Sequence, residues 1–268
     1  AGGTDALRLV DIFGGEAENV VCPMCTAVLS GKDAPLKKAC GEFMQYAKDN
    51  GLHAETKCDN QTARLVLHGV PAHASTPEMG KNAISYLMEF LSGVLEESPF
   101  VTGYQKLIGT QYDGETLGLN ISDEYGALTL NTGLISFAEG RVSVTIDIRY
   151  PLTADFAPYE KKLRESFEKA GFSYTQTGHH EPLFVNPESD LVKTLYGAYR
   201  DVTGDTQNKP FTIGGGTYSR AFDNVVAFGV EFPGEPNSIH MADEFIAIDR
   251  MLLATEIYVE AIVRLLAL

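Results

Sequence analysis

The sequence of 268 residues predicts an α/β fold, on two observations. Residues 1–99 and 100–182 both alternate β-branched runs with an amphipathic helix, in the loose order strand–strand–helix–strand. Residues 183–268 differ, because helices there flank short apolar runs and a glycine-rich turn. A doubly wound sheet needs several buried strands. This last segment offers only one or two, so it is interpreted as the closing part of an α/β domain.

The first half is predicted to open with strands and to alternate with two helices. β-branched and small residues favour strands on both sides of a Gly-Gly pair at 14–15. Leu36 and Cys40 begin an apolar series at intervals of three and four, and Asn50 precedes a glycine that is typical of a helix end. The predicted elements are strands at 6–13, 19–29, 53–58 and 62–68 and helices at 34–50 and 80–96.

The second half and the third segment show the same kinds of pattern. An amphipathic helix with Leu163 and Phe167 on its apolar face is predicted to end at Gly171. The continuous apolar run 225–230 is typical of a strand buried on both faces. The predicted elements are strands at 127–137, 141–150, 172–177, 210–213 and 225–230 and helices at 158–170, 190–202 and from 249 onward.

Charge and hydropathy disfavour two kinds of partner. Lys and Arg number 21 against 36 Asp and Glu, which gives a formal net charge of −15. Such a charge repels phosphate, so nucleic-acid binding is not expected. The longest uncharged stretches, 19–31 and 128–138, are shorter than a membrane span of about 20 residues, so no membrane partner is expected either. The N-terminus lacks the basic and apolar regions of a signal peptide, and a cytoplasmic protein is expected.

The four cysteines are interpreted as reduced thiols. Cys22 and Cys25 form one Cys-x-x-Cys pair, while Cys40 and Cys58 stand alone in the sequence. A structural zinc site needs four ligands, usually from two such pairs, and a redox pair would open a helix after a strand. A small zinc or redox module on Cys22 and Cys25 is therefore the less favoured alternative.

His240 is the candidate metal ligand. It lies in the polar loop 233–244, between the predicted buried strand and the last helix, where α/β sheets place ligands. Glu235 and Asp243 are close in sequence, and a carboxylate beside a histidine can orient its ring toward a metal. A surface histidine among acidic neighbours is the alternative.

Three further features could bind a substrate. The run 214–216, Gly-Gly-Gly, leaves backbone amides accessible to an anion, although a tight turn would use the same residues. His73 precedes a predicted helix, where a neutral imidazole could polarise an anionic intermediate; its alternative is an ordinary loop histidine. Arg149 ends a predicted strand and could grip a carboxylate with two hydrogen bonds, or form a surface ion pair.

Together these motifs resemble the M20 metallopeptidases. Residues 68–83, His-Gly-Val-Pro-Ala-His-Ala-Ser-Thr-Pro-Glu-Met-Gly-Lys-Asn-Ala, resemble the signature of that family's lid domain. Residues 214–220, Gly-Gly-Gly-Thr-Tyr-Ser-Arg, and 232–244, Phe-Pro-Gly-Glu-Pro-Asn-Ser-Ile-His-Met-Ala-Asp-Glu, resemble its C-terminal catalytic signature. The run 14–23 is similar to the opening of the lid in the PepV-like branch, the Xaa-His or carnosinase-type dipeptidases.

The resemblance implies a dipeptidase with two zinc ions. In that family the metals share a bridging carboxylate and a bridging water, and a glutamate acts as the general base. The substrate implied for the parent enzyme is a dipeptide. The site residues implied by the resemblance are His73 for the oxyanion, Arg149 for the substrate carboxylate, Asn19, Gly215 and Gly216 for other substrate contacts, and His240 for metal.

The resemblance also implies a domain organisation. Residues 1–182 correspond to a lid of two ferredoxin-like or βαβ-type halves, and residues 183–268 to the C-terminal segment of the catalytic domain. In this branch one half of the lid mimics a dimer partner, so the parent enzyme is expected to be a monomer.

The sequence departs from the family pattern in one respect. The family's His-x-Asp metal motif, its bridging aspartate and its Glu-Glu pair all precede the lid, and no His-x-Asp occurs in these residues. Catalytic zinc sites use at least three protein ligands, so we expect this chain to be a truncated fragment that is inactive and binds no zinc alone. An exposed sheet edge could make it self-associate. The alternatives are an N-acyl amino acid deacylase of the same family and a non-catalytic binding module derived from the lid.

Overall fold

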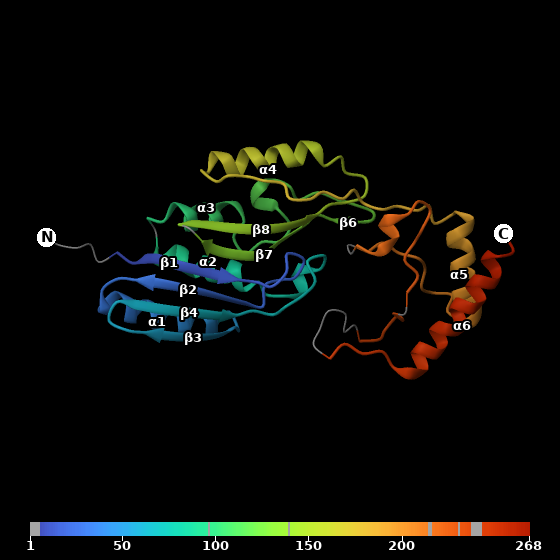
Figure 1. Cartoon of the computed structure of the whole chain (residues 1–268), viewed down its shortest axis with the longest axis horizontal. Helices are drawn as coiled ribbons and strands as arrows, with labels where there is room; N and C mark the ends of the chain where they lie inside the picture. Colours follow the sequence, from blue (N-terminus) through green and yellow to red (C-terminus); the bar gives the residue numbers. More distant parts are fainter. Residues whose placement is uncertain (1–5, 96, 139, 214–215, 230, 237–242) are drawn as a thin grey trace. The chain divides into compact units, whose positions relative to one another are not determined.

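The computed structural model describes residues 6–95, 97–138, 140–213, 216–229, 231–236 and 243–268. The chain divides into two compact units, Ala1–His180 and Glu181–Leu268. The first unit contains a six-stranded sheet in the order β3-β4-β2-β1-β7-β8, in which every pair of neighbours is antiparallel (Figure 1). The predicted α/β class is confirmed.

The strands of this sheet come from both predicted halves of the first unit. They are β1 (Arg8–Gly14), β2 (Met24–Ser30), β3 (His53–Cys58), β4 (Thr62–His68), β7 (Thr129–Ala138) and β8 (Arg141–Arg149). A separate short hairpin consists of β5 (Ser122–Asp123) and β6 (Gly126–Ala127). β1 pairs with β2 on one side and with β7 on the other, so the two halves share one continuous sheet.

Close backbone approach at the β1–β7 junction requires glycine. A Cβ atom on Gly15, whose φ is +86°, would lie 1.9 Å from the carbonyl oxygen of Gly133. A Cβ atom on Gly133 would in turn lie 2.3 Å from the carbonyl oxygen of Glu18. The chain after β1 therefore crosses closely over β7. This crossing brings residues 15–20 next to the candidate site described below.

Four helices of the first unit contribute side chains to one core. They are α1 (Asp33–Asp49), α2 (Ala83–Val94), α3 (Pro99–Leu107) and α4 (Ala157–Lys169). α2 begins where the Asn82 side chain accepts hydrogen bonds from the amides of Ile84 and Ser85, as an N-cap residue does. Its apolar positions Ile84, Leu87 and Leu91 recur at helical spacing and are fully buried.

Successive side chains along the strands alternate between a buried and an exposed face of the sheet, as is usual for antiparallel strands. In β3 and β4, Ala54 and Leu67 turn into the core, while Glu55 on the other face is exposed. In β8, Ile146 and Ile148 pack against the core and the intervening Asp147 points to the opposite face. The outer face of the sheet therefore carries polar side chains that are available for binding.

The second unit contains α5 (Asp190–Thr203) and α6 (Ile248–Leu265), which pack against each other. Its buried cluster is small: Leu195, Ala198 and Ala261, with Val226 and Phe228 packed against it. No described helix of either unit is both long and apolar enough to cross a membrane.

Three predicted strands are wrong. Residues 172–177 form no strand, and their Phe172 and Tyr174 rings instead pack against Phe167 of α4. Residues 210–213 and the described part of 225–230 are also irregular, and the latter are half-buried or exposed instead of buried on both faces. A strand needs a neighbour to satisfy its backbone groups, and the described residues of the second unit contain no other strand to pair with.

Candidate functional site

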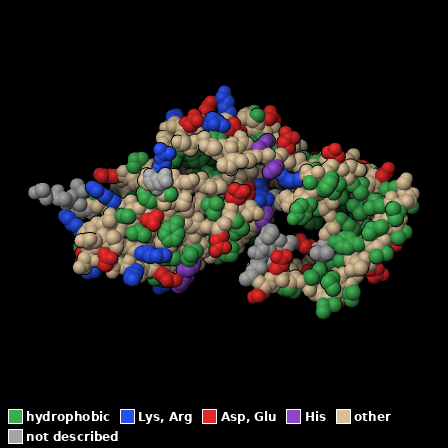
Figure 2. All heavy atoms as spheres, in the orientation of Figure 1, with side chains coloured by type: hydrophobic (Ala, Val, Ile, Leu, Met, Phe, Trp, Pro, Cys, Tyr) green, Lys and Arg blue, Asp and Glu red, His purple; other side chains and the backbone are tan. Residues whose placement is uncertain are grey.

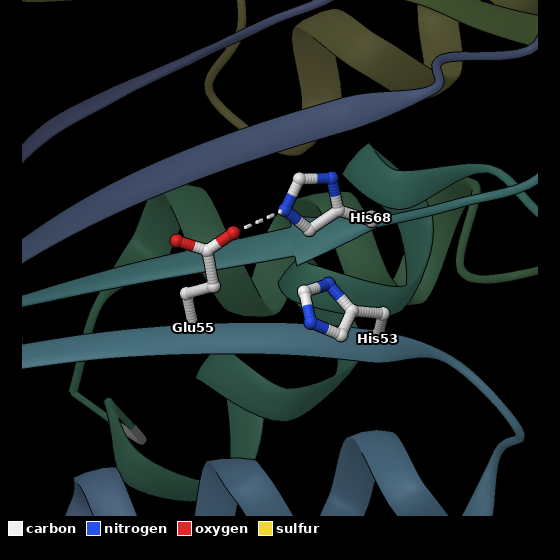
Figure 3. Close-up of side chains that lie close together, drawn as sticks. All are labelled: His53, Glu55 and His68. Carbon is white, nitrogen blue, oxygen red and sulfur yellow. Dashed lines mark hydrogen bonds and ion pairs between the residues drawn. The ribbon is translucent and has the colours of Figure 1, made fainter.

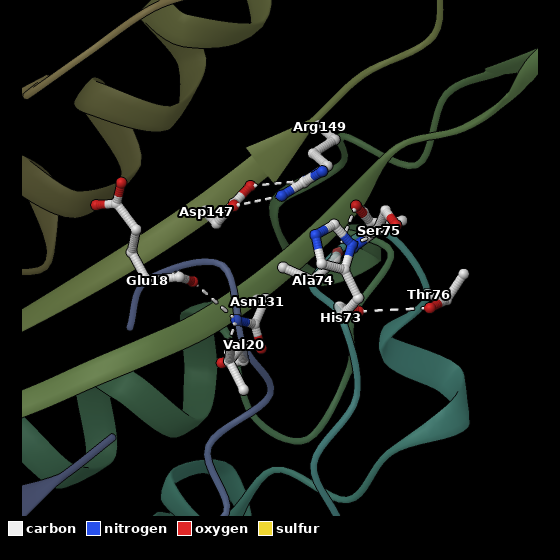
Figure 4. A network of polar contacts seen from close by, with 10 residues as sticks. Glu18, Val20, His73, Ala74, Ser75, Thr76, Asn131, Asp147 and Arg149 are labelled. Carbon is white, nitrogen blue, oxygen red and sulfur yellow. Dashed lines mark hydrogen bonds and ion pairs between the residues drawn. The ribbon is translucent and has the colours of Figure 1, made fainter. Parts of the chain in front are cut away.

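The candidate site is built around Asn131, a buried polar side chain of β7. Its Nδ2 donates to the carbonyl oxygens of Glu18 at 3.1 Å and Val20 at 3.0 Å (Figure 4). Its Oδ1 accepts from the Asn82 side-chain amide at 3.0 Å. Asn131 is 2% exposed, so these bonds replace water that cannot reach it. The two carbonyls flank Asn19 in sequence, and one buried amide therefore fixes the loop that carries Asn19.

A second loop, which carries His73, is tied to the same strand. The Thr129 hydroxyl donates to the carbonyl oxygen of Ala74 at 3.1 Å, and the Ala74 amide donates to the carbonyl oxygen of Asn19 at 2.9 Å. An isolated bridge joins Val20 to His73. Asn19 and His73, 54 positions apart by their numbers, are thereby neighbours at one end of the sheet.

The surroundings of His73 set its tautomer. The backbone amide of Ser75 donates to Nδ1 at 3.2 Å, and the Ser75 hydroxyl oxygen lies 2.6 Å from the same nitrogen. A nitrogen that receives an N–H must offer its lone pair, so a neutral ring carries its proton on Nε2. His73 is therefore held as a hydrogen-bond donor at Nε2.

Arg149 reaches the same end of the sheet from β8. Arg149 is the direct cross-strand partner of Thr129, the residue that holds Ala74. Its Nε and Nη2 donate to Oδ1 and Oδ2 of Asp147 at 3.2 and 3.0 Å, in a bidentate pair whose side chains are 20% and 16% exposed. Asp147 fixes the orientation of this guanidinium, which presents a positive charge beside the His73 loop (Figure 4).

The remaining predicted site residues belong to the second unit. Gly216 is exposed and precedes a short turn in which the Thr217 hydroxyl accepts from the Ser219 amide at 3.3 Å. Gly215 and His240 lie outside the described residues. Glu235, predicted near His240, forms an ion pair with Nε of Arg250 at 2.5 Å.

Cys22 and Cys25 do not have the environment of a redox or zinc pair. Both are buried, and burial raises the pKa of Cys22 to about 11 and the pKa of Cys25 well above its usual range. The Cys22 thiol donates to the carbonyl oxygen of Met24 at 3.1 Å. Because the thiolate is the reactive and metal-binding form, these are structural thiols of the core.

Where the structure describes the chain, His53, Glu55 and His68 are the group of three potential ligands close enough for one metal ion (Figure 3). They lie on β3 and β4 and include none of the predicted site residues. These three residues carry no local sequence signal, because only the strand register brings His53 opposite His68. Beside His73 and Arg149, the described residues do not assemble the ligand set of a two-zinc centre.

Comparison with known proteins gives the family. The model of peptidase family M20/M25/M40 matches residues 18–264. A Staphylococcus epidermidis protein named "Putative dipeptidase" is 33% identical over 225 residues, 82% of this chain and 48% of its own length. "Putative dipeptidase YtjP" of Bacillus subtilis is 33% identical over 264 residues, 96% of this chain and 55% of its own length. The chain thus spans about half the length of these relatives, and it belongs to the M20/M25/M40 peptidase family.

Proposed function

We propose that this chain supplies the substrate-binding residues of a dipeptidase. The names of its relatives support a dipeptide substrate. The observation that carries the proposal is the meeting of Asn19, His73 and Arg149 at one end of the sheet, joined through Thr129 and Asn131. A hydrogen-bond donor beside a guanidinium suits a small substrate with a peptide carbonyl and a carboxylate.

In this proposal His73 acts on the scissile carbonyl. Attack of water on a peptide carbonyl moves negative charge onto its oxygen. The Nε2–H of His73 donates to that oxygen, and the bond strengthens as charge develops, which lowers the barrier. The fixed position of Nδ1 on the Ser75 amide means that little reorganisation is needed when the charge appears.

Arg149 binds the C-terminal carboxylate of the dipeptide. A guanidinium carries five N–H donors in a planar fork, and Asp147 contacts it through Nε and Nη2. This contact orients the fork before substrate arrives, so less side-chain freedom is lost on binding. Asn19 is proposed to contact the substrate from the adjoining loop. Gly215 and Gly216 are proposed as backbone contacts.

His240 is proposed as a metal ligand of the whole enzyme, as the family resemblance implies. The described residues do not assemble the ligands of a two-zinc centre, so we assign no step of the reaction to a metal here. The proposed role of this chain is substrate binding and charge stabilisation.

Exposed apolar side chains of the second unit support the proposal that further protein completes the enzyme. Phe211, Phe222 and Ile248 are 82%, 68% and 74% exposed. Hydrophobic side chains gather on the face of this unit that Figure 2 shows, and an apolar surface of this kind marks a site of contact with other protein. We therefore propose that this chain alone lacks activity.

The test compares the complete gene product with this chain alone. Both are assayed with Xaa-His dipeptides and with N-acyl amino acids, in the presence of zinc. The proposal expects the complete product to hydrolyse dipeptides and this chain to hydrolyse neither substrate. Hydrolysis of N-acyl amino acids alone would instead identify a deacylase, and no hydrolysis by the complete product would identify a binding module. Dipeptide hydrolysis by this chain would contradict the proposed need for further protein.

A further inference from the structure

Two histidines and a glutamate gather on the outer face of β3 and β4 (Figure 3). His53 and His68 are direct cross-strand partners, and Glu55 follows His53 by two residues on the same face of its strand. Ala54 and Leu67 alternate with them and turn into the core. The register of two well-packed strands therefore holds all three polar side chains toward solvent.

The separation of the ligand atoms suits a single metal ion. One nitrogen of each ring and one carboxylate oxygen all lie within 4.8 Å of one another. Nε2 of His68 is 3.0 Å from Oε1 of Glu55. A tetrahedral zinc ion with metal–ligand distances of about 2.0–2.1 Å separates its ligand atoms by about 3.4 Å. The three side chains are exposed or half-buried, so a change of rotamer can bring their ligand atoms closer together.

The donor atoms indicate the type of cation. Calcium and magnesium take oxygen ligands, whereas two imidazole nitrogens and one carboxylate suit zinc and other first-row divalent cations. Three protein ligands leave a fourth position for water. The net charge of −15 further favours the approach of a cation.

We propose that His53, Glu55 and His68 form a zinc-binding site on the outer face of the sheet. The site shares no residue with the proposed substrate site and does not depend on the proposed function. It gives this chain an affinity for zinc of its own, contrary to the expectation that the chain alone binds none.

Calorimetric titration of the whole chain with zinc chloride tests the site. The variants are His53→Gln, His68→Gln and Glu55→Gln, which keep similar side-chain size at solvent-facing positions. His180→Gln is the matched control, because His180 is an exposed histidine of the same unit outside the cluster. We expect the unaltered chain and the control to bind one zinc ion, and each histidine variant to bind it more than about tenfold more weakly.

A second measurement separates loss of binding from loss of folding. Zinc that binds only the folded chain raises the thermal unfolding midpoint. This rise should disappear in His53→Gln and His68→Gln, whereas their far-ultraviolet circular dichroism without zinc should match that of the unaltered chain. His240→Ala should retain both the zinc ion and the rise. Equal zinc affinity in the unaltered chain and His68→Gln, or zinc binding lost only in His240→Ala, would overturn the proposal, as would no zinc binding by the unaltered chain.

Discussion

The proton of His73 is positioned by the residue two places further along the chain. The Ser75 amide is part of the backbone, so any residue other than proline at position 75 can present its N–H to Nδ1. The ring keeps a donor at Nε2 as long as the loop keeps its shape, and the loop is held by Thr129 and Asn19. A change in the geometry of this loop would therefore also change the tautomer of His73.

Replacement of His73 by alanine should reduce turnover. Loss of one donor to a developing oxyanion typically lowers kcat by about 100- to 1000-fold, with a smaller effect on KM. The measurement is steady-state hydrolysis of a dipeptide by the complete gene product. His180→Ala is the control and should keep full activity. A decrease of less than about threefold in His73→Ala would exclude the proposed role.

Arg149 is expected to affect substrate affinity more than turnover. Arg149→Met removes the positive charge, and Arg149→Lys keeps the charge but loses the bidentate fork. Both variants should raise KM for a dipeptide with a free C-terminus, Arg149→Met by about tenfold or more, since charge-assisted hydrogen bonds contribute about 1.5–3 kcal/mol. The same dipeptide with an amidated C-terminus should discriminate little between the three enzymes. An equal loss on both substrates would mean that Arg149 does not bind the carboxylate.

At the scale of elements, two glycines in the same unit should respond in opposite directions to alanine. Gly133 lies where the chain after β1 crosses β7, with 2.3 Å between its added Cβ and the Glu18 carbonyl oxygen. Gly41 lies on an exposed turn of α1, where an added Cβ meets no atom within 4 Å. Gly133→Ala should lower the free energy of unfolding by about 1–3 kcal/mol through overpacking. Gly41→Ala should raise it by about 0.5–1 kcal/mol through helix propensity.

Urea denaturation followed by circular dichroism measures both free energies. Gly133→Ala should also weaken dipeptide binding by the complete gene product, because Gly133 contacts the residue before Asn19. A Gly133→Ala protein as stable as the unaltered one would show that the crossing can relax without cost.

Sequence patterns predicted the elements whose signals are local. α2 follows from its apolar spacing, and the Asn82 cap only moves its start by a few residues. α3 was missed although Ser98 and Pro99 are a typical helix start, with Ser98 accepting from the Val101 amide at 3.5 Å. The apolar run 225–230 predicts a strand, but the described residues of the second unit contain no strand with which it could pair. The apolar spacing of the last helix predicts that Leu252 faces inward, but on α6 Leu252 is 63% exposed and Ala254 is buried.

The site could be predicted only in part, because some of its contacts join residues that are distant in the sequence. His73 and Arg149 carry recognisable local motifs, and strand pairing shows how they meet. Asn131, which holds the loop around Asn19, has no local signal, because its partners Glu18 and Val20 are more than a hundred positions away. The His53–His68 pair is likewise visible only once the register of β3 and β4 is known.

At the scale of the whole chain, the two units should unfold separately. The first unit buries a large cluster that includes Phe43, Leu87 and Tyr104, whereas the second buries only Leu195, Ala198 and Ala261 in its cluster. Stability grows with buried apolar area, so the second unit should open at lower urea concentration. Hydrogen exchange measured by mass spectrometry should show high protection in β2, β4 and α2 and low protection in α5 and α6. A single transition with equal protection in both units would contradict this expectation.

The shared sheet also has a consequence for how the chain folds. β1 needs β7 as its second neighbour, and the Asn131 bond that closes this junction joins residues 113 positions apart. During synthesis the first four strands, β1 to β4, leave the ribosome well before β7. The edge of β1 that pairs with β7 therefore stays unpaired until β7 has been synthesised. Long-range pairing of this kind slows folding, and an unpaired strand edge recruits other chains. We therefore expect aggregation and chaperone dependence to be concentrated in the interval before β7 is synthesised.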